Sequence, residues 1–148
     1  MKKTTLIYLE KDDKYLMLHR NKKVNDINKD KWIGVGGHVE ENETIDECVI
    51  REVKEETNLD LISFKLHGEV LFVLNGYEEL MYVYTSKEFK GVLKECNEGT
   101  LEWINKNEVI NLPIWEGDKL IFELMKIDNY FKLKLVYEND VLINVEKY

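Results

Sequence analysis

Apolar and polar residues follow the two-residue period of β-strands along much of this chain. Runs of this kind, bounded by turn residues, predict strands. They are expected over residues 4–10, 14–19, 62–75, 78–86, 101–105, 130–137 and 141–147. Turns are expected at Lys11-Asp12-Asp13, Asn75-Gly76 and Glu138-Asn139-Asp140, and Asn-Gly is the strongest short hairpin signal. The pattern therefore predicts three hairpins.

A helical period replaces the strand pattern over residues 44–57 and again over 115–127. In the first of these helices, apolar residues form one stripe. The stripe consists of Ile45, Val49 and Val53, with Cys48 beside them. Thr44 is the expected N-cap, with Glu47 three residues later completing a capping box. Asn58 follows as the expected left-handed C-cap.

The remaining segments predict how these elements connect. Residues 21–31 are polar and are expected to form a loop, and residues 32–39 form a short extended piece broken by glycines. Hairpins and helices alternate along the chain, so we expect an α+β or α/β sandwich with a mixed sheet between helices. The length of 148 residues predicts a single domain, 1–148.

Composition narrows the classes of function. No apolar run approaches the roughly 18 residues of a membrane span, and no signal peptide is evident, so we expect a cytoplasmic protein with no membrane partner. Two cysteines without a CxxC motif argue against a disulfide framework or a structural zinc site. A formal charge of −8 argues against binding a nucleic acid polymer, and an acidic site needs cations before it can hold a phosphorylated substrate.

A group of carboxylates on the first helix is the strongest chemical signal. Glu52, Glu55 and Glu56 stand at i, i+3 and i+4, which places them on one helix face. Like charges at this spacing repel, and hard oxygen ligands suit Mg²⁺ or Mn²⁺. A solvated acidic face is the alternative interpretation. Gly36-Gly37 just before the helix favours the metal site, because glycine lets the backbone approach an ion closely.

The stretch GHVEENETIDECVIREVKEETNL, residues 37–59, resembles the Nudix box. The positions in register are Gly37, Glu43, Arg51, Glu52, Val53, Glu55, Glu56 and Leu59. Asn58 replaces the consensus glycine, and asparagine tolerates the same positive φ. The resemblance implies a Nudix α/β/α sandwich and a Mg²⁺- or Mn²⁺-dependent attack of water on a nucleotide substrate.

Other segments resemble one branch of this family, the MutT or 8-oxo-dGTP diphosphatase group. They are KWIGVGGHVEENETI, GEVLFVLNGYEELMYVY, IWEGDKLIF and NYFKL. The resemblance implies hydrolysis of oxidised purine nucleoside triphosphates, such as 8-oxo-dGTP, to nucleoside monophosphate and pyrophosphate. It also implies a role in nucleotide pool sanitation, the removal of oxidised nucleotides.

The same resemblance assigns roles to individual residues. It implies metal ligands in the carbonyl of Gly36 and in the carboxylates of Glu52, Glu55, Glu56 and Glu98. The general base is then Glu55 or Glu98, and the sequence leaves that choice open. Glu43 and Arg51 match a structural ion pair. Arg20 matches a cation that meets the phosphates or the base, although an arginine at a strand end can also be merely solvated.

The purine pocket that the resemblance implies is less complete. Trp115 and Asp118 match an aromatic residue that stacks on the base and an acid that binds its edge, and Phe72 is expected to line the pocket. Gly117 stands where a second acid is expected, and Ile33 where an asparagine contacts the purine. Selectivity for the oxidised base is therefore expected to be weaker than in the mammalian-type enzymes.

Three other functions remain compatible with parts of this pattern. Another nucleoside diphosphate derivative, such as a nucleotide sugar, a dinucleotide or capped RNA, would use the same metal residues with a different pocket. A Nudix-fold isomerase of isoprenoid diphosphates is disfavoured because no matching cysteine and glutamate signature is present. A ligand-binding module without catalysis is disfavoured by the complete set of glutamates. A monomer and a homodimer are both compatible with the sequence.

Overall fold

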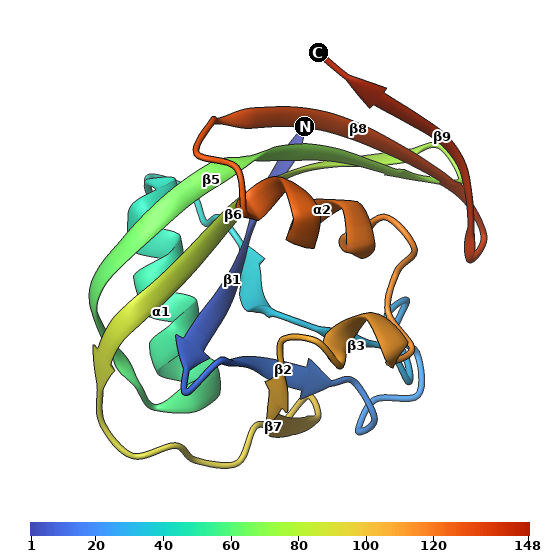
Figure 1. The fold of residues 1–148 in the computed structure, drawn as a ribbon. Helices are drawn as coiled ribbons and strands as arrows, with labels where there is room; N and C mark the ends of the chain where they lie inside the picture. Colours follow the sequence, from blue (N-terminus) through green and yellow to red (C-terminus); the bar gives the residue numbers. More distant parts are fainter.

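Nine strands joined in one sheet organise the chain in the computed structural model, which describes residues 1–148 (Figure 1). They are β1 (Lys2–Lys11), β2 (Lys14–His19), β3 (Trp32–Ile33), β4 (Val35–His38), β5 (Asp60–Leu74), β6 (Tyr77–Lys90), β7 (Thr100–Asn105), β8 (Phe131–Glu138) and β9 (Val141–Lys147). The helices are α1 (Ile45–Thr57) and α2 (Asp118–Met125), with a single 3₁₀ turn η1 at Val109–Asn111. Neither helix is long and apolar enough to cross a membrane.

The sheet is mixed, as the sequence predicted. Its strand order is β3-β2-β1-β6-β5-β8-β9, with β4 paired to β1 and β7 paired to β2. β1 runs parallel to β6 and β5 runs parallel to β8, whereas the other pairs are antiparallel. β1 is therefore central, because it joins the β2–β3–β7 part of the sheet to the larger part.

The two helices cover opposite faces of the sheet (Figure 1). Along β1, Leu6 and Tyr8 join the apolar cluster that contains α2, whereas Ile7 and Leu9 join the cluster that contains α1. Successive side chains of a strand point to opposite faces, so one apolar strand supplies both cores. This arrangement confirms the α/β sandwich that the sequence predicted.

The first helix has the ends that its sequence predicted. The Thr44 hydroxyl accepts a hydrogen bond from the Glu47 amide, and the Glu47 carboxylate accepts one from the Thr44 amide. Asn58 closes the helix in the left-handed conformation at φ 69°, and its N–H donates to the carbonyl of Lys54. Both caps satisfy backbone groups that the helix itself leaves unpaired. They fix where α1 begins and ends, and hence where its glutamates lie.

The hairpin turns also follow the sequence. Asp12 and Asp13 both have positive φ, as do Asn75 and Gly76, which suits two-residue turns between twisted strands. β5 and β6 extend further than predicted and contain register shifts near Ser63. The tips of the β5–β6 and β8–β9 hairpins are in contact. The Asn139 amide donates a hydrogen bond to the Asn75 side chain over 2.9 Å.

The second helix is shorter than the predicted range of 115–127, which was wrong at both ends. α2 begins only at Asp118, and the amide of Asp118 donates to the carbonyl of Trp115 in a turn. Gly117, at the N-cap position, has no side chain with which to cap a longer helix. Trp115 therefore lies in the connection before α2, where tertiary contacts decide its orientation.

Candidate functional site

A cavity of about 490 Å³ opens between the sheet, the start of α2 and the loop 21–31. Nine of the site residues predicted from sequence line it. They are Arg20, Ile33, Gly36, Glu52, Glu56, Phe72, Glu98, Trp115 and Asp118. The carboxylates of Glu52, Glu56 and Glu98 form one region of this cavity, and the residues around Trp115 form another. The structure thus brings together two groups that are far apart in the sequence.

Close packing at two glycines allows the carboxylate region to form. A side chain on Gly36 would place its Cβ 1.9 Å from the carbonyl oxygen of Thr5. A Cβ on Gly37 would lie 2.5 Å from the carboxylate of Glu52. The Gly36 amide also donates to Glu56 Oε2 over 3.3 Å. Only glycine permits this approach of β4 to β1 and α1.

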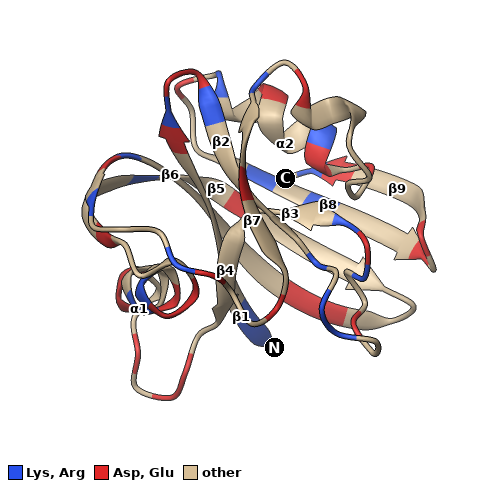
Figure 2. Cartoon of the chain, turned by 90° about the horizontal axis from the view of Figure 1, so that it is seen from below, with Lys and Arg blue, Asp and Glu red and all other residues tan.

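Burial and mutual repulsion raise the pKa values of Glu52 and Glu56. Burial, followed by contact with Glu98 and repulsion from Glu52, raises the pKa of Glu56 to about 9. Burial is also the main cause that raises the pKa of Glu52. Acidic residues are concentrated on α1, which Figure 2 shows along its axis. A bound cation would favour the ionised forms and relieve the repulsion.

The carboxylates are held by cations of the chain rather than arranged around one point. No group of three acidic, histidine or cysteine side chains converges closely enough to enclose an ion. Instead, Glu52 Oε1 lies 2.8 Å from Arg51 Nη1. Glu98 lies 3.2 Å from Arg20 and 3.4 Å from Lys23. The donor set still fits a hard divalent cation, because it offers oxygen ligands in a partly buried acidic pocket.

Glu55 does not join the other two helix carboxylates. Its side chain is 59% exposed and lies outside the cavity lining. Glu55 Oε2 is 3.2 Å from Arg51 Nη1, one turn earlier on the helix. Glu52 and Glu56 turn toward the sheet, whereas position 55 points toward solvent. A role for Glu55 as ligand or base therefore stays a prediction that requires its side chain to leave Arg51.

Arg51 organises the segment before α1. It binds both oxygens of Glu43, with Nε at 2.6 Å from Oε2 and Nη2 at 3.0 Å from Oε1. Nη2 also donates to the carbonyl of His38 over 3.1 Å. The hydrogen bonds from Arg51 lower the pKa of Glu43 to about 2. The pair predicted from sequence is thus present, and Arg51 also contacts Glu52.

The guanidinium group of Arg20 is already paired with acidic side chains and is not free to bind phosphate. Its Nε donates to Asp26 over 2.7 Å, and its Nη1 donates to Glu98 over 3.2 Å. The side chain is only 15% exposed. It therefore connects the loop 21–31 to Glu98, and any contact with substrate phosphates would compete with these two acids.

Aromatic side chains build the second region of the cavity. The Trp115 ring packs edge-on against Phe72, with ring centres 5.3 Å apart, and against Tyr137 at 4.8 Å. Trp115 Nε1 donates to the Asn28 side chain over 2.7 Å. The ammonium group of Lys31 lies over the same ring, 4.7 Å from its centre. A base that stacks on Trp115 would have to take the place of Lys31 or lie beside it.

Asp118 supplies a buried carboxyl group beside these aromatic rings. Burial raises its pKa to about 7, although a backbone hydrogen bond near Trp115 and the charge of Lys31 oppose the shift. Tyr8 and Tyr137 are the other titratable groups that face it. Asp118 can therefore donate or accept a hydrogen bond near neutral pH, as recognition of a base edge requires.

The raised pKa of Asp118 predicts a pH dependence of stability. Between about pH 4 and pH 7 the unfolded chain has lost this proton, whose ordinary pKa is 3.8, while the folded protein retains it. Rising pH therefore lowers the free energy of unfolding in this range. Asp118→Asn should remove this contribution, so its melting temperature should rise relative to the native protein as pH increases from 4 to 8. A difference in melting temperature that does not change with pH would contradict the shift.

Several cavity residues were not predicted from the sequence. Asp26 and Asn28 lie in a polar loop whose conformation no local pattern predicts, although Asn28 binds Trp115. Tyr137 belongs to β8, where Phe131, Leu133 and Leu135 share its face. That two-residue alternation could have indicated an inward Tyr137, but not its proximity to Trp115.

The sequence is similar to a known protein family and to individual members of it. The chain matches the family model of the NUDIX domain over residues 2–125. It is 30% identical over 131 residues to an uncharacterized Nudix hydrolase of Bacillus subtilis (strain 168), which covers 84% of this chain and 79% of that protein. It is 30% identical over 110 residues to the oxidized purine nucleoside triphosphate hydrolase of Danio rerio, over 70% of each chain.

The fold is similar to that of a solved structure along almost its whole length. A crystal structure of a MutT protein from Bacillus halodurans superposes with a TM-score of 0.87 and 28% identity. The match covers 99% of this chain and 97% of that one. Together with the family match, it shows that the chain belongs to the Nudix family of hydrolases.

Proposed function

We propose that this protein is a Mg²⁺-dependent hydrolase of purine nucleoside triphosphates, including oxidised ones such as 8-oxo-dGTP. The observation that carries the proposal is the single cavity that joins a carboxylate region to an aromatic region. The first suits a cation and phosphates, and the second suits a flat base. Similarity to the Danio rerio protein, which is named for oxidized purine nucleoside triphosphates, supports the same substrate class.

The residues that would hold the metal are Glu52, Glu56 and Glu98, with the carbonyl of Gly36. Glu52, Glu56 and Glu98 line the carboxylate region, and burial, together with the nearby carboxylates of Glu98 and Glu52, raises the pKa of Glu56. When bound, Mg²⁺ or Mn²⁺ supplies charge neutralisation for the phosphate oxygens of the substrate. Arg51 would hold Glu52 in place from outside the cavity.

The chemistry would be the attack of water on one phosphorus atom of the triphosphate. The bond between the α- and β-phosphates breaks, and nucleoside monophosphate and pyrophosphate are released. Of the two candidate bases, Glu98 lies in the cavity and Glu55 does not. We therefore assign Glu98 to accept the proton of the attacking water, with Arg20 orienting its carboxylate.

Selectivity between oxidised and plain guanine is expected to be modest. Ile33 cannot replace the polar contact of an asparagine, and Gly117 carries no acid. Apolar packing discriminates between similar ligands by roughly 10–200-fold, whereas a lost hydrogen bond in a polar site costs far more. The enzyme should accept 8-oxo-dGTP and reject dGTP less sharply than a pocket with both polar residues.

The decisive experiment is a hydrolysis screen with Mg²⁺ that identifies the products. The substrates are canonical and oxidised nucleoside triphosphates, dinucleotides, nucleotide sugars and capped RNA. We expect an oxidised purine triphosphate to react fastest, to give monophosphate and pyrophosphate, and to stop reacting when a chelator is added. A faster reaction with a nucleotide sugar or a pyrimidine would assign another substrate. Binding without any product would indicate a ligand-binding module.

A further inference from the structure

The hydroxyl group of Tyr137 occupies the space of the side chain that residue 117 lacks. A Cβ built on Gly117 would lie 2.7 Å from Tyr137 Oη and 2.5 Å from Leu135 Cδ1. Both distances are shorter than a normal contact, so position 117 has no room for an acid in this packing. The Tyr137 hydroxyl therefore occupies the space that a side chain at position 117 would need.

A hydrogen bond fixes the direction of this hydroxyl. The Gly117 amide donates to Tyr137 Oη over 2.8 Å, which uses a lone pair of the oxygen. The hydroxyl hydrogen of Tyr137 has no acceptor within the chain. Burial and the neighbouring Asp118 raise the pKa of Tyr137, so the phenol keeps its proton. It is therefore a hydrogen-bond donor without a partner.

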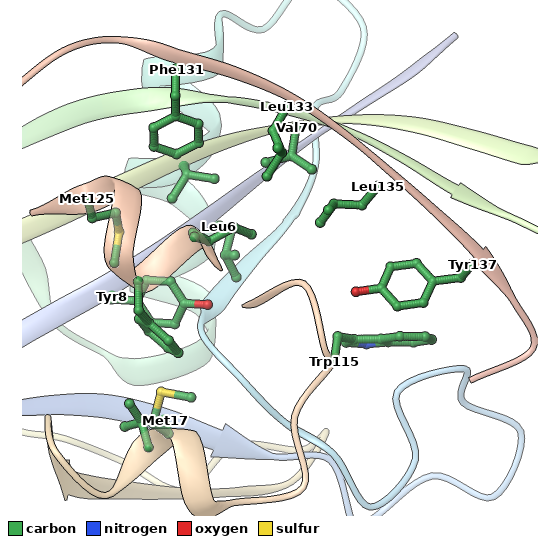
Figure 3. Packing of buried hydrophobic residues seen from close by; sticks show 14 residues of the cluster. Leu6, Tyr8, Met17, Val70, Trp115, Met125, Phe131, Leu133, Leu135 and Tyr137 are labelled. Atoms are coloured by element: carbon green, nitrogen blue, oxygen red, sulfur yellow. The ribbon is translucent and has the colours of Figure 1, made fainter. Parts of the chain in front are cut away.

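Tyr137 is also part of the cavity wall. Its residue surface is 1% exposed, yet it lines the same cavity as Trp115 and Asp118. Figure 3 shows the Tyr137 ring beside Trp115, with its hydroxyl directed away from β8 toward the interior. A further contact with Phe72, at 5.2 Å between ring centres, limits how far the ring can turn.

We propose that Tyr137 reads the edge of the bound base as a hydrogen-bond donor, next to the acceptor that Asp118 supplies. This inference rests on the proposed function, because it requires a purine against Trp115. It changes the expected chemistry of position 117: the acid that is missing there is replaced by a donor from β8. The base must then present an acceptor to Tyr137 and donors to Asp118.

A guanine-type edge matches this arrangement better than an adenine-type edge. Guanine presents the carbonyl oxygen O6 beside N1–H and an amino group, so one donor and two carboxylate oxygens all find partners. Adenine offers a single donor and a single acceptor there, and leaves one carboxylate oxygen unpaired. Tyr137 is therefore a specificity-determining residue that favours 6-oxopurines.

The test measures binding of reaction products without metal, which separates base recognition from catalysis. Calorimetry at pH 8 with chelator compares dGMP with the monophosphate of 2-aminopurine deoxyribonucleoside, which lacks both O6 and the hydrogen on N1. The native protein should bind dGMP at least ~10-fold more tightly. Tyr137→Phe should weaken dGMP binding by ~10-fold and leave binding of the analogue unchanged, because the analogue has no O6 to accept from Tyr137. The analogue also lacks N1–H, but that loss affects its binding to the native protein and to the variant equally.

Tyr84→Phe is the matched control. Tyr84 is another buried tyrosine, and its hydroxyl donates to Asp46 over 2.7 Å, away from the cavity. Its loss should alter stability without changing the ratio of the two affinities. The role of Tyr137 would be overturned if Tyr137→Phe lost affinity for both ligands equally. It would also be overturned if the native protein bound the two ligands with equal affinity. The comparison of the two affinities in the native protein needs no variant. It therefore tests the role of Tyr137 even if Tyr137→Phe does not fold.

The two proposals fail in different ways. A native protein that hydrolyses purine triphosphates but binds dGMP and the 2-aminopurine analogue equally would refute the role of Tyr137 alone. A native protein that neither binds purine monophosphates nor hydrolyses purine triphosphates would refute the proposed function, and the inference about Tyr137 with it.

Discussion

Replacing Glu56 with glutamine should reduce turnover about 100-fold or more, the usual effect of removing a charge-stabilising group from an active site. Glu56 is the most buried of the three helix carboxylates, and it lies against both Glu98 and the Gly36 amide. Glutamine keeps the size and a carbonyl acceptor for Gly36, but it removes a negative ligand. Steady-state kinetics with saturating Mg²⁺ would measure the loss.

Melting temperature separates this effect from simple damage to the fold. Because Glu56 is buried among like charges, its neutral replacement should leave the melting temperature unchanged or raise it. Glu123→Gln, which removes an exposed acid paired only with Lys126 on α2, is the control and should retain full turnover. Near-normal turnover in Glu56→Gln would refute the metal site proposed here.

Arg51→Ala should lower both stability and turnover. Arg51 makes a two-point contact with Glu43 and a third contact with Glu52. Losing charge-assisted hydrogen bonds of this kind costs about 2 kcal/mol, which corresponds to a fall in melting temperature of roughly 6 °C for a domain of this size. Turnover should fall as well, because Glu52 loses the partner that orients it. Unchanged melting temperature with lost turnover would instead make Arg51 a catalytic residue.

The stability defect of Arg51→Ala should depend on pH. Arg51 holds the pKa of Glu43 at about 2, below its ordinary value of 4.5. A lowered pKa stabilises the fold above pH 4.5, and this contribution is lost as pH falls toward 2. The difference between the native protein and Arg51→Ala should therefore shrink in acid. Lys54→Ala, which removes an exposed pair with Asp60, should show only a small difference at any pH.

The local signals in the sequence determined the ends of the main elements. Thr44, Glu47 and Asn58 have side chains that satisfy backbone groups within a few residues, so the ends of α1 follow from sequence. Asn75-Gly76 likewise needs only its own backbone freedom to make a turn. The start of α2 was not determined in this way, because Gly117 offers no side-chain cap and Trp115 is held by distant residues.

The different environments of the three carboxylates on α1 could not be predicted from the sequence. Helical spacing places Glu52, Glu55 and Glu56 near one another, but it cannot distinguish their environments. The structure buries Glu56, half-buries Glu52 and leaves Glu55 in solvent. This division depends on the angle at which α1 packs on β4 and β1, which the sequence pattern does not specify.

The sequence by itself therefore determined the order of the elements, the family and the glutamates of α1, because each depends on short-range geometry or on a motif. Only the tertiary structure decided that Arg20 holds Glu98, that Lys31 covers Trp115, and that Tyr137 fills the space at Gly117. Tyr137 lies on β8 and Gly117 in the turn before α2, 20 residues apart in the chain. Their contact exists only because β8 pairs with β5 and packs against the start of α2, and pairing between distant segments is set by the whole core.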